Sequence, residues 1–163
     1  MKPNKKNTPF WKLIAAIALC QGVGIASASL SNTKASVWFA MLKKPTWNPP
    51  AYLFGPVWTT LYLLMGISLW LIWTNAAPQN SKQPAYYLFA AQLFLNFWWS
   101  IIFFRFEAPA WALVNITAMV VLIFLTILQF ARFSKTAAWL LVPYMAWVSF
   151  ATVLNFAIWN LNR

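Results

Sequence analysis

The sequence predicts an all-α membrane protein, a bundle of five transmembrane helices. Hydrophobic residues make up 62% of the 163 residues and charged residues only 8%, whereas a soluble domain is about 45–50% apolar and about 25% charged. The apolar residues form five runs, each near the roughly 20 residues that a spanning helix needs. The cations flank these runs and avoid their centres, where each would cost about 2.5–3.5 kcal/mol.

The five helices are expected at residues 13–30, 49–73, 85–104, 110–130 and 136–159. They leave no room for a second domain, so residues 1–163 are treated as one domain. An odd number of crossings places the two termini on opposite sides of the membrane.

The first apolar run follows a basic start and ends in small residues, as a secretory signal peptide does. It is nevertheless long enough to span the bilayer, and Gly22, Gly24, Ala26 and Ala28 suit close helix packing. We therefore expect a retained helix rather than a cleaved leader.

The second helix is expected to begin with Asn48 as N-cap and Pro49 as its first residue. Pro56 is expected to kink or loosen its first turns. The preceding segment, residues 43–50, contains three prolines and is predicted to be a stiff, extended loop. Because such loops often act as lids, we expect it to cover a pocket.

The remaining helices are separated by short polar connections. Residues 74–84 have the composition of a turn, and residues 105–109 form a tight connection with charges of the sign that each helix dipole prefers. Pro143 is expected to interrupt the last helix.

The composition excludes most site chemistry. The chain has no His, one Cys (Cys20) and one carboxylate side chain (Glu107), so it offers no metal-ligand set, no carboxylate pair and no catalytic triad. We expect no metal and no intrinsic cofactor. The net charge of +11 is spread around the apolar runs, which suits lipid headgroups and not a nucleic-acid groove.

The chain is rich in aromatic residues, with 12 Trp and 14 Phe, so we expect its function to depend on aromatic surfaces. Tryptophans near the helix ends are interpreted as an interfacial belt. Five deeper ones pack between helices or line a cavity: Trp58, Trp70, Trp98, Trp99 and Trp147. Gln92, Asn96 and Trp99 share one helix face. Each buried amide either hydrogen bonds between helices, a contribution of roughly 0.6 kcal/mol, or orients a ligand in an apolar pocket.

Residues 38–50 read WFAMLKKPTWNPP. This run resembles the W-x-x-x-L-x-K-P-x-W-x-P-P signature of the TspO/MBR family, which comprises the tryptophan-rich sensory proteins and the mitochondrial translocator protein, or peripheral benzodiazepine receptor. Residues 54–66, 92–99 and 143–155 are similar to the second, third and fifth helices of that family.

The resemblance implies a five-helix, homodimeric protein that binds tetrapyrroles such as protoporphyrin IX and haem, and in some members sterols or isoquinolines. It implies ligand-binding roles for Trp38, Phe39, Trp47, Trp58, Tyr62, Asn96, Trp99, Trp147 and Ala151. It also implicates Trp58 and Trp147 in light-dependent porphyrin breakdown.

Two motifs of the family are altered in this chain. The cholesterol motif of animal members has Tyr and a basic residue where this chain has Phe156 and Asn160, so sterol recognition there is not expected. A Gly-x-x-x-Gly of some members is replaced by Tyr87 and Ala91, so a dimer through that face needs another close contact.

Three functions remain open. The first is a porphyrin-binding receptor or sensor, with Lys34, Lys43 or Lys44 meeting the propionates. The second is a photo-oxidative porphyrin-degrading enzyme that uses Trp as electron donor. A porphyrin or sterol transporter ranks last, because no charge is expected at the midplane and no internal repeat is visible.

Two observations predict opposite orientations in the membrane. Seven of the 12 cations lie on the side of the N-terminus, which favours a cytoplasmic N-terminus. The family resemblance implies the reverse. Because seven against five is a small bias, we expect the C-terminus to be cytoplasmic.

Overall fold

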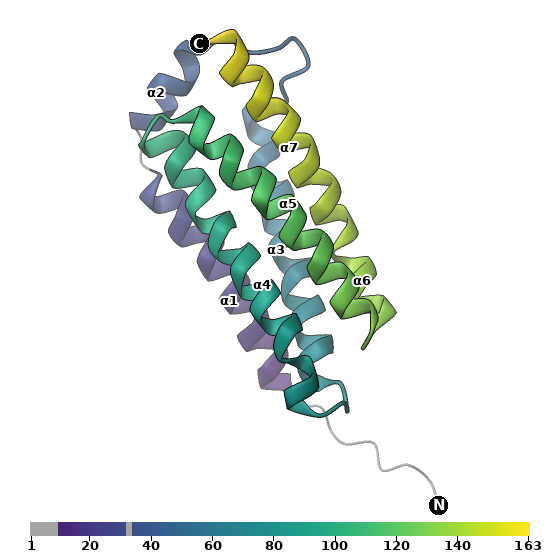
Figure 1. Ribbon diagram of the computed structural model, residues 1–163. Helices are drawn as coiled ribbons and strands as arrows, with labels where there is room; N and C mark the ends of the chain where they lie inside the picture. The colour runs from purple at the N-terminus through teal and green to yellow at the C-terminus, as the bar shows by residue number, and fades with distance from the viewer. Residues whose placement is uncertain (1–9, 32–33) are drawn as a thin grey trace, which may run out of the picture.

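The computed structural model describes residues 10–31 and 34–163, and of residues 34–36 only the backbone. It confirms the five-helix bundle: five of its helices are long and apolar enough to cross a membrane. These helices run side by side, and α1 begins at one end of the bundle while α7 ends at the other (Figure 1). No strand occurs in the described part of the chain.

The elements follow one another along the chain as α1 (Phe10–Leu30), α2 (Lys34–Met41), α3 (Ala51–Thr74), α4 (Gln79–Ser100), the π-helical turn η1 (Ile101–Arg105), α5 (Pro109–Ala131), α6 (Lys135–Leu140) and α7 (Val142–Leu161). The spans are α1, α3, α4 continued by η1, α5, and α6 continued by α7. The break between α6 and α7 confirms the interruption expected near Pro143, which lies in the first turn of α7.

The predicted start of α3 is wrong. The helix begins at Ala51 after Pro50, and Asn48 does not cap it, since its side-chain Nδ2 instead donates to the carbonyl of Pro49 at 2.9 Å. The reason is local: a residue that precedes proline disfavours the helical conformation, which applies to both Asn48 and Pro49. α3 then continues as one helix through Pro56.

The expected helices differ from the observed ones at two further points. Residues 34–41, which lie between the first two expected spans, form the short helix α2. α4 begins at Gln79 and runs through Pro84, six residues earlier than expected. Polar residues suggested a turn there, but the first turns of α4 lie at the end of the bundle, where a helix can remain polar.

Lys82 does not reach toward headgroups as its position at a helix end suggested. Its side chain is only 2% exposed, and Nζ donates to the carbonyls of Ile72 at 3.3 Å and Asn75 at 3.0 Å. These carbonyls belong to the end of α3, which has no further helical donors. Asn75 Nδ2 in turn donates to the carbonyl of Phe133 at 2.8 Å, so one polar cluster joins α3, α4 and the α5–α6 connection.

Close packing of α1 on α3 depends on two glycines. A Cβ on Gly24 would overlap the ring of Tyr62, and one on Gly66 would lie 2.6 Å from the Cα of Ile17. Gly22 has nothing within 4 Å of its Cβ position. Of the two α1 glycines that were expected to support packing, only Gly24 therefore does so.

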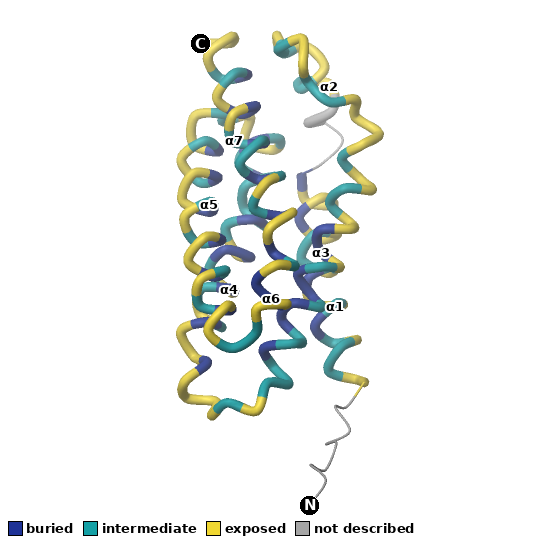
Figure 2. Tube along the Cα trace, turned by 90° about the vertical axis from the view of Figure 1, so that its right-hand side faces the viewer, coloured by how far each residue is buried: buried dark blue, intermediate teal, exposed yellow. Residues whose placement is uncertain are grey.

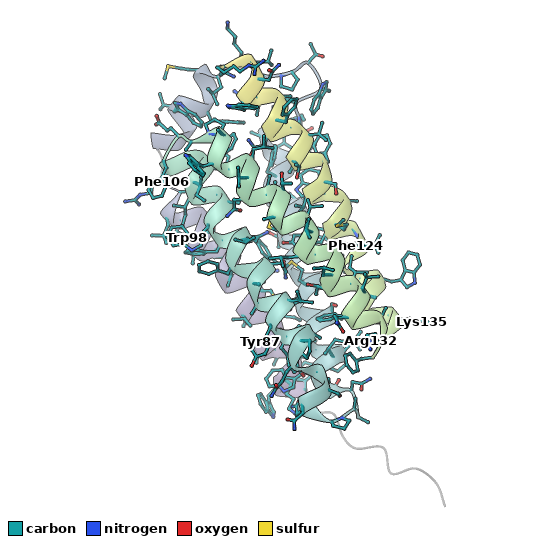
Figure 3. All side chains as sticks on the ribbon, viewed as in Figure 1. Tyr87, Trp98, Phe106, Phe124, Arg132 and Lys135 are labelled. Carbon is teal, nitrogen blue, oxygen red and sulfur yellow. The ribbon has the colours of Figure 1, made fainter. Side chains whose placement is uncertain are left out.

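Exposure separates a core from a lipid-facing surface. Buried positions face the interior of the bundle and exposed positions face outward (Figure 2). Trp111 and Trp139, near helix ends, are 72% and 71% exposed, as an interfacial belt requires. The labelled cations Arg132 and Lys135 lie toward one end of the bundle and Phe106 lies toward the other (Figure 3).

Candidate ligand-binding site

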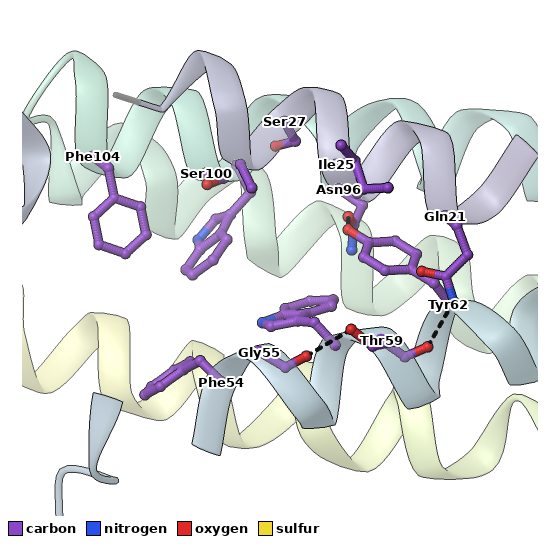
Figure 4. Close-up of a pocket in the computed structure, with 14 residues that line it drawn as sticks. Gln21, Ile25, Ser27, Phe54, Gly55, Thr59, Tyr62, Asn96, Ser100 and Phe104 are labelled. Atoms are coloured by element: carbon purple, nitrogen blue, oxygen red, sulfur yellow. Dashed lines mark hydrogen bonds between the residues drawn. The ribbon is translucent and has the colours of Figure 1, made fainter. Parts of the chain in front are cut away.

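A cavity of about 350 Å³ lies between α1, α3 and the α4–η1 span, in the half of the bundle that contains α2. It falls within the usual range for small-molecule sites. Its walls are mostly apolar, with a few amide and hydroxyl groups (Figure 4). The lining residues are Gln21, Gly24, Ile25, Ser27, Ala28, Phe54, Gly55, Trp58, Thr59, Tyr62, Asn96, Trp99, Ser100 and Phe104.

Two indoles, Trp58 and Trp99, line this cavity. Their ring centroids are 6.5 Å apart and their planes are tilted by 33°. Trp99 is held in place because its Nε1 donates to Asn155 Oδ1 at 3.2 Å, and Asn155 Nδ2 donates to the carbonyl of Pro109 at 2.8 Å. Trp58 packs on Tyr62, with centroids 5.6 Å apart.

Asn96 connects the cavity to a buried hydrogen-bond network. Its Oδ1 accepts from the hydroxyl of Tyr62, and its Nδ2 donates to the hydroxyl of Tyr144 at 3.0 Å. Tyr144 donates to Gln92 Oε1 at 2.8 Å. The network joins α3, α4 and α7, so Asn96 both hydrogen bonds between helices and lines the cavity, whereas Gln92 has only the first role.

The edge of the cavity is formed by α1, from which the sequence predicted no site residue. Gln21 Nε2 donates to the carbonyl of Thr59 at 2.9 Å, and Ser27 Oγ donates to the carbonyl of Phe97 at 2.7 Å. Ile25 and Gly55, which also line the cavity, are exposed on the outer surface. The cavity therefore opens sideways between α1 and α3. The sequence did contain one indication of this role, because Gln21 and Ser27 are polar residues within an otherwise apolar run.

Comparison with known proteins identifies the family to which this chain belongs. The model of the TspO/MBR family matches residues 16–160. The chain belongs to the TspO/MBR family. It is 44% identical to the tryptophan-rich protein TspO of Chlorobaculum tepidum over 96% of this chain and 99% of the relative. It is 39% identical to the human translocator protein over 77% and 75%, and 35% identical to the tryptophan-rich sensory protein of Cereibacter sphaeroides over 93% and 92%.

Membership of the TspO/MBR family and the five apolar helices make this chain a multi-pass membrane protein. The names of these relatives support a membrane sensory or translocator role.

The structure divides the nine residues implied by the TspO/MBR resemblance into three groups. Trp58, Tyr62, Asn96 and Trp99 line the cavity. Trp147 lies behind the wall, with its ring 5.9 Å from that of Phe54, and Ala151 is buried in the core.

The other three residues lie on α2 and the following loop. Trp38 packs on Phe103 with centroids 5.7 Å apart. Phe39 packs on Phe104, which lines the cavity, at 5.4 Å. Trp47 packs on Phe150 of α7 at 5.8 Å. These three residues pack on aromatic side chains near the α2 end of the cavity, and they do not line the cavity themselves.

The loop at residues 43–50, proposed from the sequence as a lid, is attached to the C-terminal end of α7. The backbone N–H of Lys43 donates to Asn162 Oδ1 at 2.9 Å, and Asn162 Nδ2 donates to the carbonyl of Lys43 at 2.9 Å. Lys44 Nζ lies 4.3 Å from the centroid of the Phe39 ring. The side chain of Lys34, the third predicted propionate partner, lies outside the described residues.

Proposed function

We propose that this TspO/MBR protein binds a tetrapyrrole, protoporphyrin IX or haem, in the cavity between α1, α3 and α4. The observation that carries the proposal is that Trp58 and Trp99 line one cavity together with the Asn96 amide. A flat conjugated ring gains from stacking on indole faces, and apolar walls with a few placed polar groups are typical of small-molecule sites.

The spacing of the two indoles indicates how such a ring would bind. Carbon atoms in contact lie about 3.5–4.0 Å apart, so a ring between two parallel indoles needs about 7–8 Å from face to face. The centroids of Trp58 and Trp99 are 6.5 Å apart. Because Trp99 is hydrogen bonded to Asn155, we expect Trp58 to move aside or to offer one face only.

The ligand's carboxylates have to reach beyond the cavity wall for a cation. Among the described lining residues there is no Lys or Arg. Phe104 lines the cavity and is followed by Arg105, and it contacts Phe39, over whose ring Lys44 lies. We therefore propose that the propionates point toward η1 and α2.

The described lining residues favour recognition of the macrocycle over ligation of its metal. They include no His, Cys or Met, and the hydroxyl of Tyr62 is already donated to Asn96. These lining residues would therefore hold haem through its macrocycle and would supply no ligand to its iron.

A dark titration of the purified protein with protoporphyrin IX tests the proposal, read by quenching of Trp fluorescence and by the Soret band. Trp58→Leu should weaken binding about threefold to tenfold, because one stacking partner contributes about 0.5–1.5 kcal/mol beyond its buried area. Trp98→Leu is the matched control, since Trp98 neighbours Trp99 and does not line the cavity. Equal affinity of both variants and the unaltered protein would refute the site.

A second candidate function is light-dependent porphyrin breakdown. One observation favours it: the buried indole Nε1 of Trp147 has no hydrogen-bond partner among the described residues, and its ring contacts Phe54 of the cavity wall. An illuminated porphyrin can accept one electron from an indole, which leaves a porphyrin radical anion and an indole radical cation, and dioxygen from solution is the oxidant that ring breakdown requires. Trp147 lies one ring away from the proposed ligand. Illumination of the complex separates the two functions, since only turnover removes the Soret band and forms a new product.

A further inference from the structure

A second hollow lies on the outer surface of the bundle, between α1 and α4 and over α3. Its volume is about 440 Å³, and among the described residues it shares no lining residue with the cavity above. Its floor is formed by the buried side chains of Leu69, Phe89 and Leu93. We call it the α1–α4 groove; it is lined by Leu19, Val23, Leu69, Tyr86, Phe89, Ala90, Leu93, Phe94 and Phe97.

The groove is closed at one end. There α1 and α4 are joined by the hydrogen bond from Ser27 Oγ to the carbonyl of Phe97 at 2.7 Å, and by the contact of Ser31 Oγ with Ser100 Oγ at 2.6 Å. Toward the start of α1 no such bond joins the two helices within the described residues, and Leu69 of α3 lies between them. The groove therefore accepts a chain that enters from the membrane surface at the start of α1.

The length and polarity of the groove match a lipid tail. From Tyr86 to Phe97 the α4 wall is about 16 Å long at 1.5 Å per residue, close to half of the roughly 30 Å hydrocarbon core of a bilayer. Among the described lining residues only Tyr86 has a polar side-chain group, and it lies at the open end. A hydrocarbon chain in the groove meets apolar side chains of three helices.

A lysine lies at the open end of the groove. Lys12 is seven residues before Leu19 and eleven before Val23, which places it on the same face of α1 as the groove wall. Its Nζ lies 5.8 Å and 5.3 Å from the ring centroids of Trp11 and Trp73, a pair of indoles of the interfacial kind.

No carboxylate side chain of this protein is placed to pair with Lys12. The single one in the sequence is Glu107, which follows η1 at the opposite end of the bundle. The neighbouring cation Lys82 donates to two backbone carbonyls, whereas Lys12 meets only aromatic faces among the described residues. An anion that does not belong to this chain could therefore form an ion pair with Lys12.

We propose that the α1–α4 groove binds one acyl chain of an anionic phospholipid, from the leaflet at which α1 begins, with the lipid phosphate on Lys12. The floor and both walls hold the tail, and the cation selects the headgroup. This site is separate from the tetrapyrrole cavity and does not depend on it.

Native mass spectrometry of the detergent-purified protein tests the headgroup. The protein is mixed with equal amounts of phosphatidylglycerol and phosphatidylcholine that carry the same acyl chains, and the retained lipids are counted. The unaltered protein should retain phosphatidylglycerol preferentially. Lys12→Gln should reduce that preference about fivefold, the value of one lysine near an anionic surface, while Lys12→Arg keeps it. Arg132→Gln, which removes a cation that follows α5 at the same end of the bundle, should change nothing.

The groove itself is tested by filling it. Ala90→Phe places a ring in its wall and should lower retention of both phospholipids and of oleate, without changing the headgroup preference of what remains. Because Lys12→Gln leaves the apolar wall intact, it decides the proposal even if Ala90→Phe does not fold.

Three results would overturn the proposal. The first is equal retention of the two phospholipids by the unaltered protein. The second is an unchanged preference in Lys12→Gln. The third is loss of an oligomer, with lipid retention unchanged, in Ala90→Phe, which would make the groove a contact between copies of this chain.

Discussion

The close approach of α1 to α3 at the cavity predicts a strong effect of one added methyl group. In Gly24→Ala the new Cβ would lie 2.7 Å and 2.8 Å from two ring carbons of Tyr62, and closer to a third. Ordinary carbon contacts are about 3.5–4.0 Å, so the ring or the helix has to move by about 1 Å. Tyr62 resists this movement because its hydroxyl is donated to Asn96 and its ring packs on Trp58.

The cost follows from overpacking. Inserting a methyl group into a packed site typically costs about 1–3 kcal/mol, and loss of the bond to Asn96 adds roughly 0.6 kcal/mol in a membrane. The gain in helix propensity from Gly to Ala, up to about 1 kcal/mol, opposes these terms.

Gly22→Ala is the matched control, because it receives the same gain in propensity and has nothing within 4 Å of the new Cβ. The difference in unfolding free energy between the two variants therefore isolates the steric cost, about 1–3 kcal/mol. At about 2–4 °C per kcal/mol for a chain of this size, Gly24→Ala should melt roughly 2–12 °C below Gly22→Ala.

Two measurements check this expectation: thermal unfolding in detergent, followed by circular dichroism, and dark titration with protoporphyrin IX. Affinity should fall in Gly24→Ala only, because Tyr62 lines the cavity. In a Tyr62→Ala background the added methyl group should cost little, since the ring it meets is gone. Equal melting temperatures and equal affinities for the two glycine variants would refute the reasoning.

Three further predictions concern the site and its orientation. Trp147→Phe should abolish light-driven porphyrin loss while weakening dark binding little, because the ring is kept and the indole donor is lost; degradation at the unaltered rate would exclude that donor. A reporter fused after Arg163 should be active in the cytoplasm, and activity only in the periplasm would reverse the orientation proposed here. Porphyrin should slow amide exchange across Lys43–Trp47 if that loop is a lid, and Asn162→Ala, which removes both side-chain bonds to Lys43, should speed exchange there without ligand. Unchanged exchange at saturating porphyrin would leave Trp47 as an interfacial residue.

The sequence by itself determined the class of the protein and its five spans. Length, apolar content and the placement of cations carry that information, because the bilayer imposes one length and one polarity on every spanning helix. The spacing of Asn96 and Trp99 also predicted their shared face, since a helix places residues three and four apart on one side. The family resemblance, by contrast, came from matching whole motifs and not from such rules.

Only the tertiary structure decided which helices enclose the cavity. Gln21 and Gly24 of α1 line it, while Trp147 lies behind Phe54; nothing in the spacing of either segment distinguishes these outcomes, because helical periodicity gives a face and not the neighbour that the face meets. The burial of Lys82 has the same origin. A lysine near a helix end normally reaches for headgroups, and it turned inward here because the end of α3 lies beside it with carbonyls that have no helical donors left.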